Sequence, residues 1–191
     1  MKITAKDALI VVDVQNDFCP GGAMPVNEGH RIVPVINRLL RLFDHVVFTR
    51  DWHPENHFSF QDPPEFKDGS WPPHCVADSP GAEFHGDLHV PVDAYIVSKG
   101  MNPDEEAYSG FSDKELAEYL RVKGVERIFV CGLATEYCVK ETALDGLAEG
   151  FQVVLVENAC RGVNFPPGSA TEAVEEMREA GVQIHWSEDL E

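Results

Sequence analysis

The sequence has few basic residues for its length. It contains 15 lysines and arginines against 33 aspartates and glutamates, which gives a formal charge of −18 at pH 7. A surface this acidic repels the phosphates of nucleic acids, so we expect no nucleic-acid partner. The same charge favours solubility and is compatible with a neutral small-molecule substrate.

Long apolar runs are also missing. No run approaches the roughly 18 residues that a membrane helix requires, so we expect no membrane-embedded segment. Residues 1–7 show no apolar segment of the signal-peptide type, and we expect a cytoplasmic protein. The 5 cysteines form no C-x-x-C pair, which in a cytosolic chain favours free thiols over a disulfide framework.

Short β-branched apolar runs alternate with segments of helical periodicity. The expected strands are 8–12, 45–49, 94–98, 128–131, 152–156 and 182–185. The expected helices are about 30–42, 112–123, 136–149 and 169–181. This alternation implies right-handed crossovers and predicts an α/β protein, a three-layer α/β/α sandwich around a parallel sheet. With 191 residues, the chain is expected to form one domain, 1–191.

Residues 52–92 interrupt this pattern. They lack periodicity and are rich in proline, histidine and aromatic side chains. A loop of this length within a compact domain tends to be functional or disordered, and the aromatic content argues against disorder. We therefore expect this segment to contribute to a site.

Polar side chains follow several of the expected strands. Asp13, Asp51 and Lys99 come directly after a strand, and Cys138 is expected in the first turn of the helix that follows 128–131. Because the carboxyl ends of parallel strands share one edge, we expect these four residues to lie together. Each has a simpler explanation, since polar residues often end strands and Asp13 with Lys99 could be a structural ion pair.

The chemistry of these residue types is that of a cysteine nucleophile. Free N–H groups at a helix start favour a thiolate, so we expect a lowered pKa for Cys138. Those N–H groups can also stabilise the oxyanion of a tetrahedral intermediate. Asp13 would accept the thiol proton, and Lys99 would neutralise developing negative charge. The alternative for Cys138 is a small buried residue that packs a helix end.

A metal site is indicated near the second strand. In Asp51-Trp52-His53 the carboxylate and the imidazole lie on one face of an extended segment, and His74 could complete the set. Two histidines and one carboxylate suit Zn²⁺ or Fe²⁺ and leave positions open for water or substrate. A D-x-H pair alone is weak, and a role for His57 is left open.

The chain resembles the nicotinamidases (pyrazinamidases) within the isochorismatase-like cysteine hydrolases. The similarity lies in V-V-D-V-Q-N-D-F (11–18), T-R-D-W-H-P-E-N-H-F (49–58), W-P-P-H-C (71–75), V-S-K-G (97–100), Y-S-G-F (108–111) and V-C-G-L-A-T-E-Y-C (130–138). The second and third blocks are the most specific to nicotinamidases. The resemblance spans residues 8 to about 160.

Several structural expectations follow from this resemblance. It implies a six-stranded sheet of order 3-2-1-4-5-6 in a single isochorismatase-like domain, and a cis peptide at Leu133–Ala134. The implied functional residues are the catalytic triad Asp13, Lys99 and Cys138, the oxyanion-hole N–H groups of Ala134 and Cys138, the metal ligands Asp51, His53 and His74, and the substrate-ring walls Phe18, Trp71, Tyr108 and Tyr137. Ordinary loop packing is the alternative for the four aromatic residues.

The implied activity is hydrolysis of nicotinamide to nicotinate and ammonia, a step of NAD salvage, with pyrazinamide as a second substrate. One divalent ion is implied, with Zn²⁺ favoured and Fe²⁺ and Mn²⁺ also suitable. The alternatives are a metal-free relative acting on a vinyl ether or an N-carbamoyl compound, and a metal- or thiol-binding sensor that is not an enzyme. The sequence leaves open whether the chain forms a homo-oligomer and which of the two amides it prefers.

Overall fold

A parallel β-sheet forms the centre of the molecule. The structure is a computed structural model and describes residues 1–67, 69–112 and 114–191. Its six strands have the order β3-β2-β1-β4-β5-β6, and every pair is parallel. The strands are β1 (Asp7–Val12), β2 (His45–Asp51), β3 (Tyr95–Lys99), β4 (Arg127–Leu133), β5 (Gln152–Arg161) and β6 (Gln183–His185). The expected order 3-2-1-4-5-6 is confirmed.

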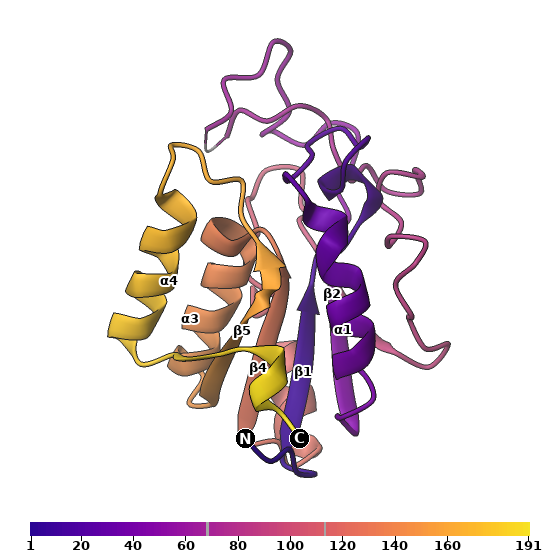
Figure 1. Cartoon of the computed structure of the whole chain (residues 1–191). Coiled ribbons are helices and arrows are strands. Elements are labelled where there is room, and N and C mark those ends of the chain that lie inside the picture. Colours follow the sequence, from indigo (N-terminus) through magenta and orange to yellow (C-terminus); the bar gives the residue numbers. More distant parts are fainter. Residues whose placement is uncertain (68, 113) are drawn as a thin grey trace.

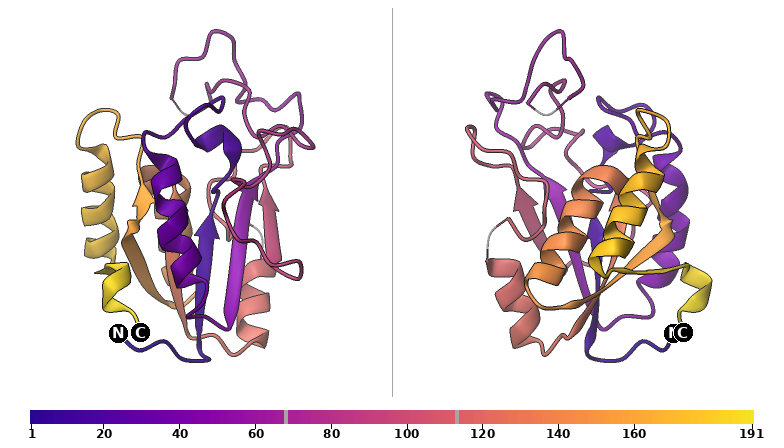
Figure 2. Two further views of the ribbon diagram at one scale, coloured as in Figure 1. Left: turned by 45° about the vertical axis from the view of Figure 1, so that its right-hand side comes forward. Right: turned by 90° about the vertical axis from the view of Figure 1, so that its left-hand side faces the viewer.

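Helices cover both faces of this sheet. They are α1 (Val33–Leu39), α2 (Glu115–Val122), α3 (Lys140–Ala148) and α4 (Ser169–Ala180). Helix α1 lies on one face, and α2, α3 and α4 lie on the other, as a doubly wound sheet requires (Figure 2). The two chain ends lie side by side below the sheet, where Ile3 N donates to Glu191 O at 2.8 Å (Figure 1).

The core is built on β1. All six of its residues are buried, and Ala8 to Val12 have no exposed surface, which agrees with a strand that is covered on both faces. Asp7 is the polar exception, and its carboxylate pairs with Arg127 at 2.7 Å. Among the described residues, no helix is both long enough and apolar enough to cross a membrane.

Several helix boundaries differ from the expected ones. Helix α1 is shorter than 30–42, because a 3-10 turn (Gly29–Ile32) precedes it and Pro34 fits only a first helical turn. Helix α2 begins at Glu115 rather than at Ser112, and Asp113 lies outside the described residues. The expected helix 136–149 is two elements, an irregular π-type turn (Thr135–Val139) and then α3.

The strand register brings the carboxyl ends of the central strands level. Val12 pairs with Thr49 on one side and with Gly132 on the other, and Asp51 pairs with Lys99. The long segment 52–92 folds back over this edge and forms the upper part of the molecule in Figure 1. Where it is described, it contains no helix and no strand beyond isolated bridges.

Candidate active site

The ammonium group of Lys99 contacts three other side chains at the sheet edge. Lys99 Nζ lies 2.8 Å from Asp13 Oδ2, 2.5 Å from Asp51 Oδ1 and 3.3 Å from Cys138 Sγ. It also donates to the carbonyl of Ala107 at 3.2 Å. All four side chains of this group are buried. The expected convergence of the strand ends is therefore present in the structure.

Asp13 is fixed against the neighbouring strand. Its backbone N–H donates to Thr49 O at 3.2 Å, and the Thr49 hydroxyl donates to Asp13 Oδ1 at 2.6 Å. Burial raises the pKa of Asp13 above its usual value, and the ammonium of Lys99 offsets part of that rise. A carboxylate with a raised pKa is a stronger base, which suits the expected role of Asp13 as the acceptor of the thiol proton.

Cys138 differs from the expectation in its electrostatics. Burial raises the pKa of its thiol well above the usual value, and Lys99 offsets this only in part. The expected lowering is wrong because burial outweighs the stabilisation of the thiolate. Cys138 also lies in the irregular turn before α3 rather than in a regular first helical turn, and Tyr137 there has non-helical φ and ψ of −118° and −109°. A raised pKa disfavours the thiolate, so a neighbouring base would assist attack by this thiol.

A second group faces the other oxygen of Asp51. His53 Nε2 lies 3.5 Å and His74 Nε2 lies 3.9 Å from Asp51 Oδ2. The Nδ1 atoms of both rings are hydrogen-bonded to carbonyls, His53 to Gly100 at 2.9 Å and His74 to Pro72 at 2.8 Å. In the neutral rings Nδ1 therefore carries the proton, and each Nε2 presents a lone pair toward Asp51.

This donor set fits a divalent metal ion. The ligand atoms of Asp51, His53 and His74 all lie within 4.8 Å of one another and are buried. Two ligand atoms that each lie about 2.1 Å from a tetrahedral zinc ion are about 3.4 Å from one another. The distances from Asp51 Oδ2 to the Nε2 atoms of His53 and His74, 3.5 Å and 3.9 Å, are close to this value. Together they supply two imidazoles and one carboxylate, as the sequence predicted.

His57 stands beside this trio with both ring nitrogens engaged. Its ring centre is 4.4 Å from that of His53. Nε2 lies 3.0 Å from Glu105 O, and Nδ1 lies 2.7 Å from Ser59 Oγ. With a proton on Nε2, the ring donates to the carbonyl and accepts from the hydroxyl. In this arrangement His57 supports the loop around the trio rather than joining it.

The turn after β4 contains Ala134 and Cys138, the two residues whose N–H groups are expected to form an oxyanion hole. The Leu133–Ala134 peptide is cis, in agreement with the resemblance. The Ala134 carbonyl accepts from Tyr137 N at 3.0 Å and from Val139 N at 3.2 Å, which fixes the Ala134 peptide against the nucleophile turn. Ala134 and Cys138 both line the adjoining cavity.

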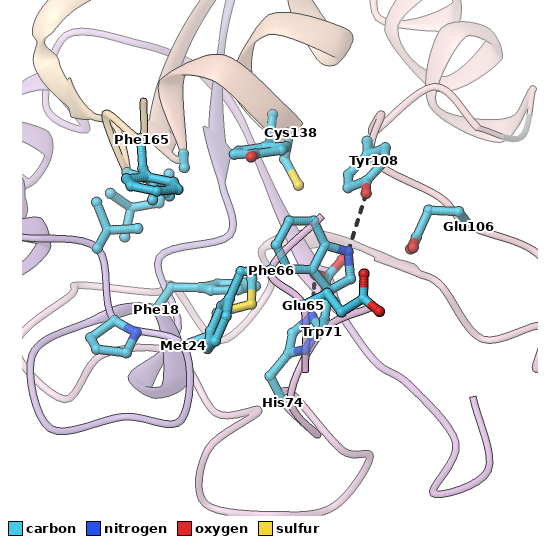
Figure 3. Close-up of a pocket in the computed structure, with 17 residues that line it drawn as sticks. Phe18, Met24, Glu65, Phe66, Trp71, His74, Glu106, Tyr108, Cys138 and Phe165 are labelled. Atoms are coloured by element: carbon cyan, nitrogen blue, oxygen red, sulfur yellow. Dashed lines mark hydrogen bonds and ion pairs between the residues drawn. The ribbon is translucent and has the colours of Figure 1, made fainter. Parts of the chain in front are cut away.

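A cavity of about 490 Å³ opens onto these groups (Figure 3). The four expected aromatic walls, Phe18, Trp71, Tyr108 and Tyr137, all line it. Trp71 Nε1 donates to the hydroxyl of Tyr108 at 3.3 Å, and the Trp71 ring meets Tyr137 edge-on at 5.7 Å. The volume lies within the range of small-molecule sites, about 300–1,000 Å³.

Other residues that line the cavity were not identified from the sequence. They include Met24, Phe66, Val163 and Phe165, which are apolar, and the acidic Glu106. They come from four separate loops, so no local spacing indicates that they meet. Glu106 Oε2 is buried without a hydrogen-bond partner among the described residues, and burial raises the pKa of this carboxyl.

Comparisons with known proteins show the family to which this fold belongs. Residues 7–189 match the model of the isochorismatase domain. The nicotinamidase of Escherichia coli is 40% identical over 96% of both chains. The zinc complex of the pyrazinamidase of Pyrococcus horikoshii superposes with a TM-score of 0.87 at 50% identity, covering 95% of this chain and 99% of that one. PnC1 from L. infantum in complex with nicotinate gives 0.92 at 36% identity, covering 100% and 98%.

Proposed function

Since the chain belongs to the isochorismatase-domain family and, within it, to the nicotinamidases, we propose that it hydrolyses nicotinamide to nicotinate and ammonia. The observation that carries the proposal is the buried group around Lys99. One ammonium contacts a thiol, a carboxylate base and a carboxylate of a metal-type trio. Each of these groups can be given a role in amide hydrolysis.

In the proposed mechanism Asp13 accepts and donates the protons. It takes the thiol proton as Cys138 Sγ attacks the amide carbon, and it then delivers that proton to the departing nitrogen. The N–H groups of Ala134 and Cys138 stabilise the oxyanion. A water molecule then attacks the thioester and gives one proton to Asp13. As the C–S bond breaks, Asp13 passes that proton to Cys138 Sγ, which restores the thiol, and the nicotinic acid loses its remaining acidic proton to solvent and leaves as nicotinate. Lys99 keeps Asp13 oriented and offsets the negative charge that develops beside it.

We propose that Asp51, His53 and His74 hold one divalent ion, Zn²⁺ in the first instance. When bound, such an ion would coordinate the ring nitrogen of the substrate and so orient its carboxamide toward Cys138. The zinc complex of the similar pyrazinamidase supports this choice, while a donor set of two imidazoles and one carboxylate also suits Fe²⁺ and Mn²⁺.

The aromatic side chains are proposed to hold the ring. Phe18 and Trp71 are almost fully buried, and Tyr108 and Tyr137 complete the inner cavity. Flat apolar walls favour a planar ring such as that of nicotinamide or pyrazinamide. We further propose a single cytoplasmic domain, 1–191, that returns nicotinate to NAD synthesis.

The alternative is a metal-free relative that acts on a vinyl ether or an N-carbamoyl compound. Such an enzyme does not need two histidines that both turn Nε2 toward one carboxylate. The geometry of His53 and His74 around Asp51 therefore favours the metal-dependent activity.

An ammonia-release assay tests the proposal. Nicotinamide, pyrazinamide and an N-carbamoyl amino acid are offered to the purified protein with and without a chelator, and Cys138→Ala serves as the inactive control. We expect ammonia from the two ring amides, none from the control and reduced release with chelator. Release from the N-carbamoyl compound alone, insensitive to chelator, would contradict the proposal.

A further inference from the structure

The cavity is larger than the proposed substrate requires. A volume of 490 Å³ is within the range that encloses drug-sized ligands, whereas nicotinamide is one ring with a carboxamide. Its inner part contains the buried Cys138, Asp51 and His74. The space beyond the ring is therefore bounded by other residues.

These outer residues are apolar and exposed. Phe66 is 58% and Phe165 is 71% exposed, and Val163 is 39% exposed, although all three line the same cavity as the catalytic cysteine. In Figure 3, Phe165 and Met24 lie on the opposite side of Cys138 from Glu106. Large apolar side chains in contact with water at the mouth of a site indicate a surface that a ligand covers.

The wall that carries Phe165 is fixed to the nucleophile turn. The carboxylate of Glu136, inside that turn, accepts hydrogen bonds from Val163 N at 3.1 Å and from Asn164 N at 2.5 Å. It also accepts from the hydroxyl of Ser169 at 3.3 Å. Because the loop 162–168 is held at two successive backbone N–H groups, the outer wall is preformed.

Substrate geometry decides which atom meets this wall. If the carboxamide of nicotinamide lies at Cys138 and the ring nitrogen lies at the Asp51, His53 and His74 trio, both anchors flank C2 of the ring. C5 is the ring carbon opposite C2, so it faces away from the buried floor and toward the exposed mouth. A substituent on C5 would then extend between Phe66 and Phe165.

From this geometry we propose that Met24, Phe66, Val163 and Phe165 form an outer apolar subsite for C5 substituents. The inference rests on the proposed function and extends its substrate class to nicotinamides that carry an alkyl or aryl group at C5. The reaction is unchanged, since water and the substituted amide give the substituted nicotinate and ammonia. Anionic substituents are disfavoured because the protein is acidic and Glu65 and Glu106 also line the cavity.

An alkyl series tests the subsite. Steady-state constants are measured for nicotinamide and its 5-methyl, 5-ethyl, 5-propyl and 5-butyl derivatives, with 5-hydroxyalkyl compounds of matched length as polar controls. We expect KM to fall about twofold to fourfold for each added methylene, with kcat little changed, because each methylene gains partial burial. The hydroxyalkyl compounds should gain less than the alkyl compounds of equal length.

Variants locate the effect. Phe165→Ala and Phe66→Ala should flatten the dependence of KM on chain length, while Phe58→Ala should keep it, since Phe58 is 47% exposed in the same long loop but does not line the cavity. Hydrolysis of nicotinamide with KM flat or rising along the series overturns the subsite and leaves the proposed function intact. An unchanged dependence in both wall variants also overturns it. Failure to hydrolyse nicotinamide itself overturns the proposed function and this inference with it.

Discussion

Substitution of Gly100 tests whether the backbone after Lys99 positions His53, a proposed metal ligand. Gly100 follows Lys99 directly, has a φ of +67°, and its carbonyl accepts a hydrogen bond from His53 Nδ1 at 2.9 Å. A Cβ atom at this position would lie 2.4 Å from His53 Cε1 and 2.6 Å from its Nδ1. The methyl group that Gly100→Ala adds would therefore collide with the imidazole ring of His53, a proposed metal ligand.

The size of the effect follows from these distances. Ordinary van der Waals contacts of a Cβ begin at 3.4 Å, so the imidazole has to move by about 1 Å. That is half of a zinc–nitrogen bond length of about 2.1 Å. Loss of ligand orientation typically lowers metal affinity about 10–100-fold, and a misplacement of about 1 Å lowers turnover about 100-fold. The left-handed backbone adds about 1–2 kcal/mol of strain for any non-glycine residue.

Gly124→Ala is the matched control. Gly124 has a similar φ of +74° at the end of α2, and a Cβ there meets no atom within 4 Å. Its substitution adds the same kind of backbone strain without a collision. The comparison between the two variants thus separates the displacement of His53 from general destabilisation.

The assay combines zinc titration of metal-stripped protein by calorimetry, thermal unfolding with and without zinc, and ammonia release from nicotinamide. We expect both variants to lose stability without metal through backbone strain, Gly100→Ala more than Gly124→Ala because of its collision with His53, and only Gly100→Ala to lose zinc affinity and turnover. If Gly100→Ala binds zinc and releases ammonia as Gly124→Ala does, then His53 is not a ligand held by this backbone, and the reasoning is refuted.

Four further predictions concern the proposed catalytic and metal-binding groups and one partly buried ion pair. Cys138→Ala should abolish ammonia release while zinc content and thermal stability persist, and measurable turnover would reject Cys138 as nucleophile. His74→Ala should lower the metal content by elemental analysis from about one ion per chain and raise KM for nicotinamide, and full occupancy with unchanged kinetics would remove it from the site. Because the proposed mechanism requires ionised Asp13, kcat/KM should fall as the pH drops through the pKa of that residue. Lys99→Ala removes the positive charge that opposes the effect of burial on this pKa, so the acidic limb of the kcat/KM profile should shift to higher pH. The loss of kcat/KM in the double variant with Asp13→Asn should not exceed the larger of the two single losses. Burial alone would raise the pKa of Asp7, but its hydrogen bonds with Arg127 and Thr4 outweigh burial and lower the pKa, so the ionised carboxylate stabilises the fold at neutral pH. Asp7→Asn should therefore lower the midpoint of thermal unfolding at pH 7. The difference from the unsubstituted protein should vanish as the pH falls below the lowered pKa.

The sheet and the inner site were predictable because each depends on a short-range signal. Runs of β-branched residues such as Ala8 to Val12 predict buried parallel strands, and the carboxyl ends of such strands meet at one edge whatever the rest of the chain does. That rule alone predicted that Asp13, Asp51 and Lys99 would converge. The strand order and the roles of the aromatic walls came from the resemblance to a family, since no local pattern specifies them.

The outer cavity and the state of the nucleophile were not predictable in the same way. Met24, Phe66 and Phe165 meet only after three loops are folded, and no periodicity links them. The pKa of Cys138 depends on how much water its surroundings exclude, a property of the packed structure. The helix-start argument assumed a regular first turn, whereas Tyr137 breaks the helical geometry next to the thiol.

The group around Lys99 and the trio of Asp51, His53 and His74 share a single carboxylate, that of Asp51. Asp51 Oδ1 contacts Lys99 at 2.5 Å, and Asp51 Oδ2 faces both imidazoles. With two ionised carboxylates and one ammonium, this buried group carries a net charge of about −1, which disfavours a thiolate or an oxyanion beside it. A divalent cation among Asp51, His53 and His74 changes the net charge to about +1. The same ion that anchors the ring would then stabilise the charge that develops at Cys138, so loss of the metal should lower kcat as well as raise KM.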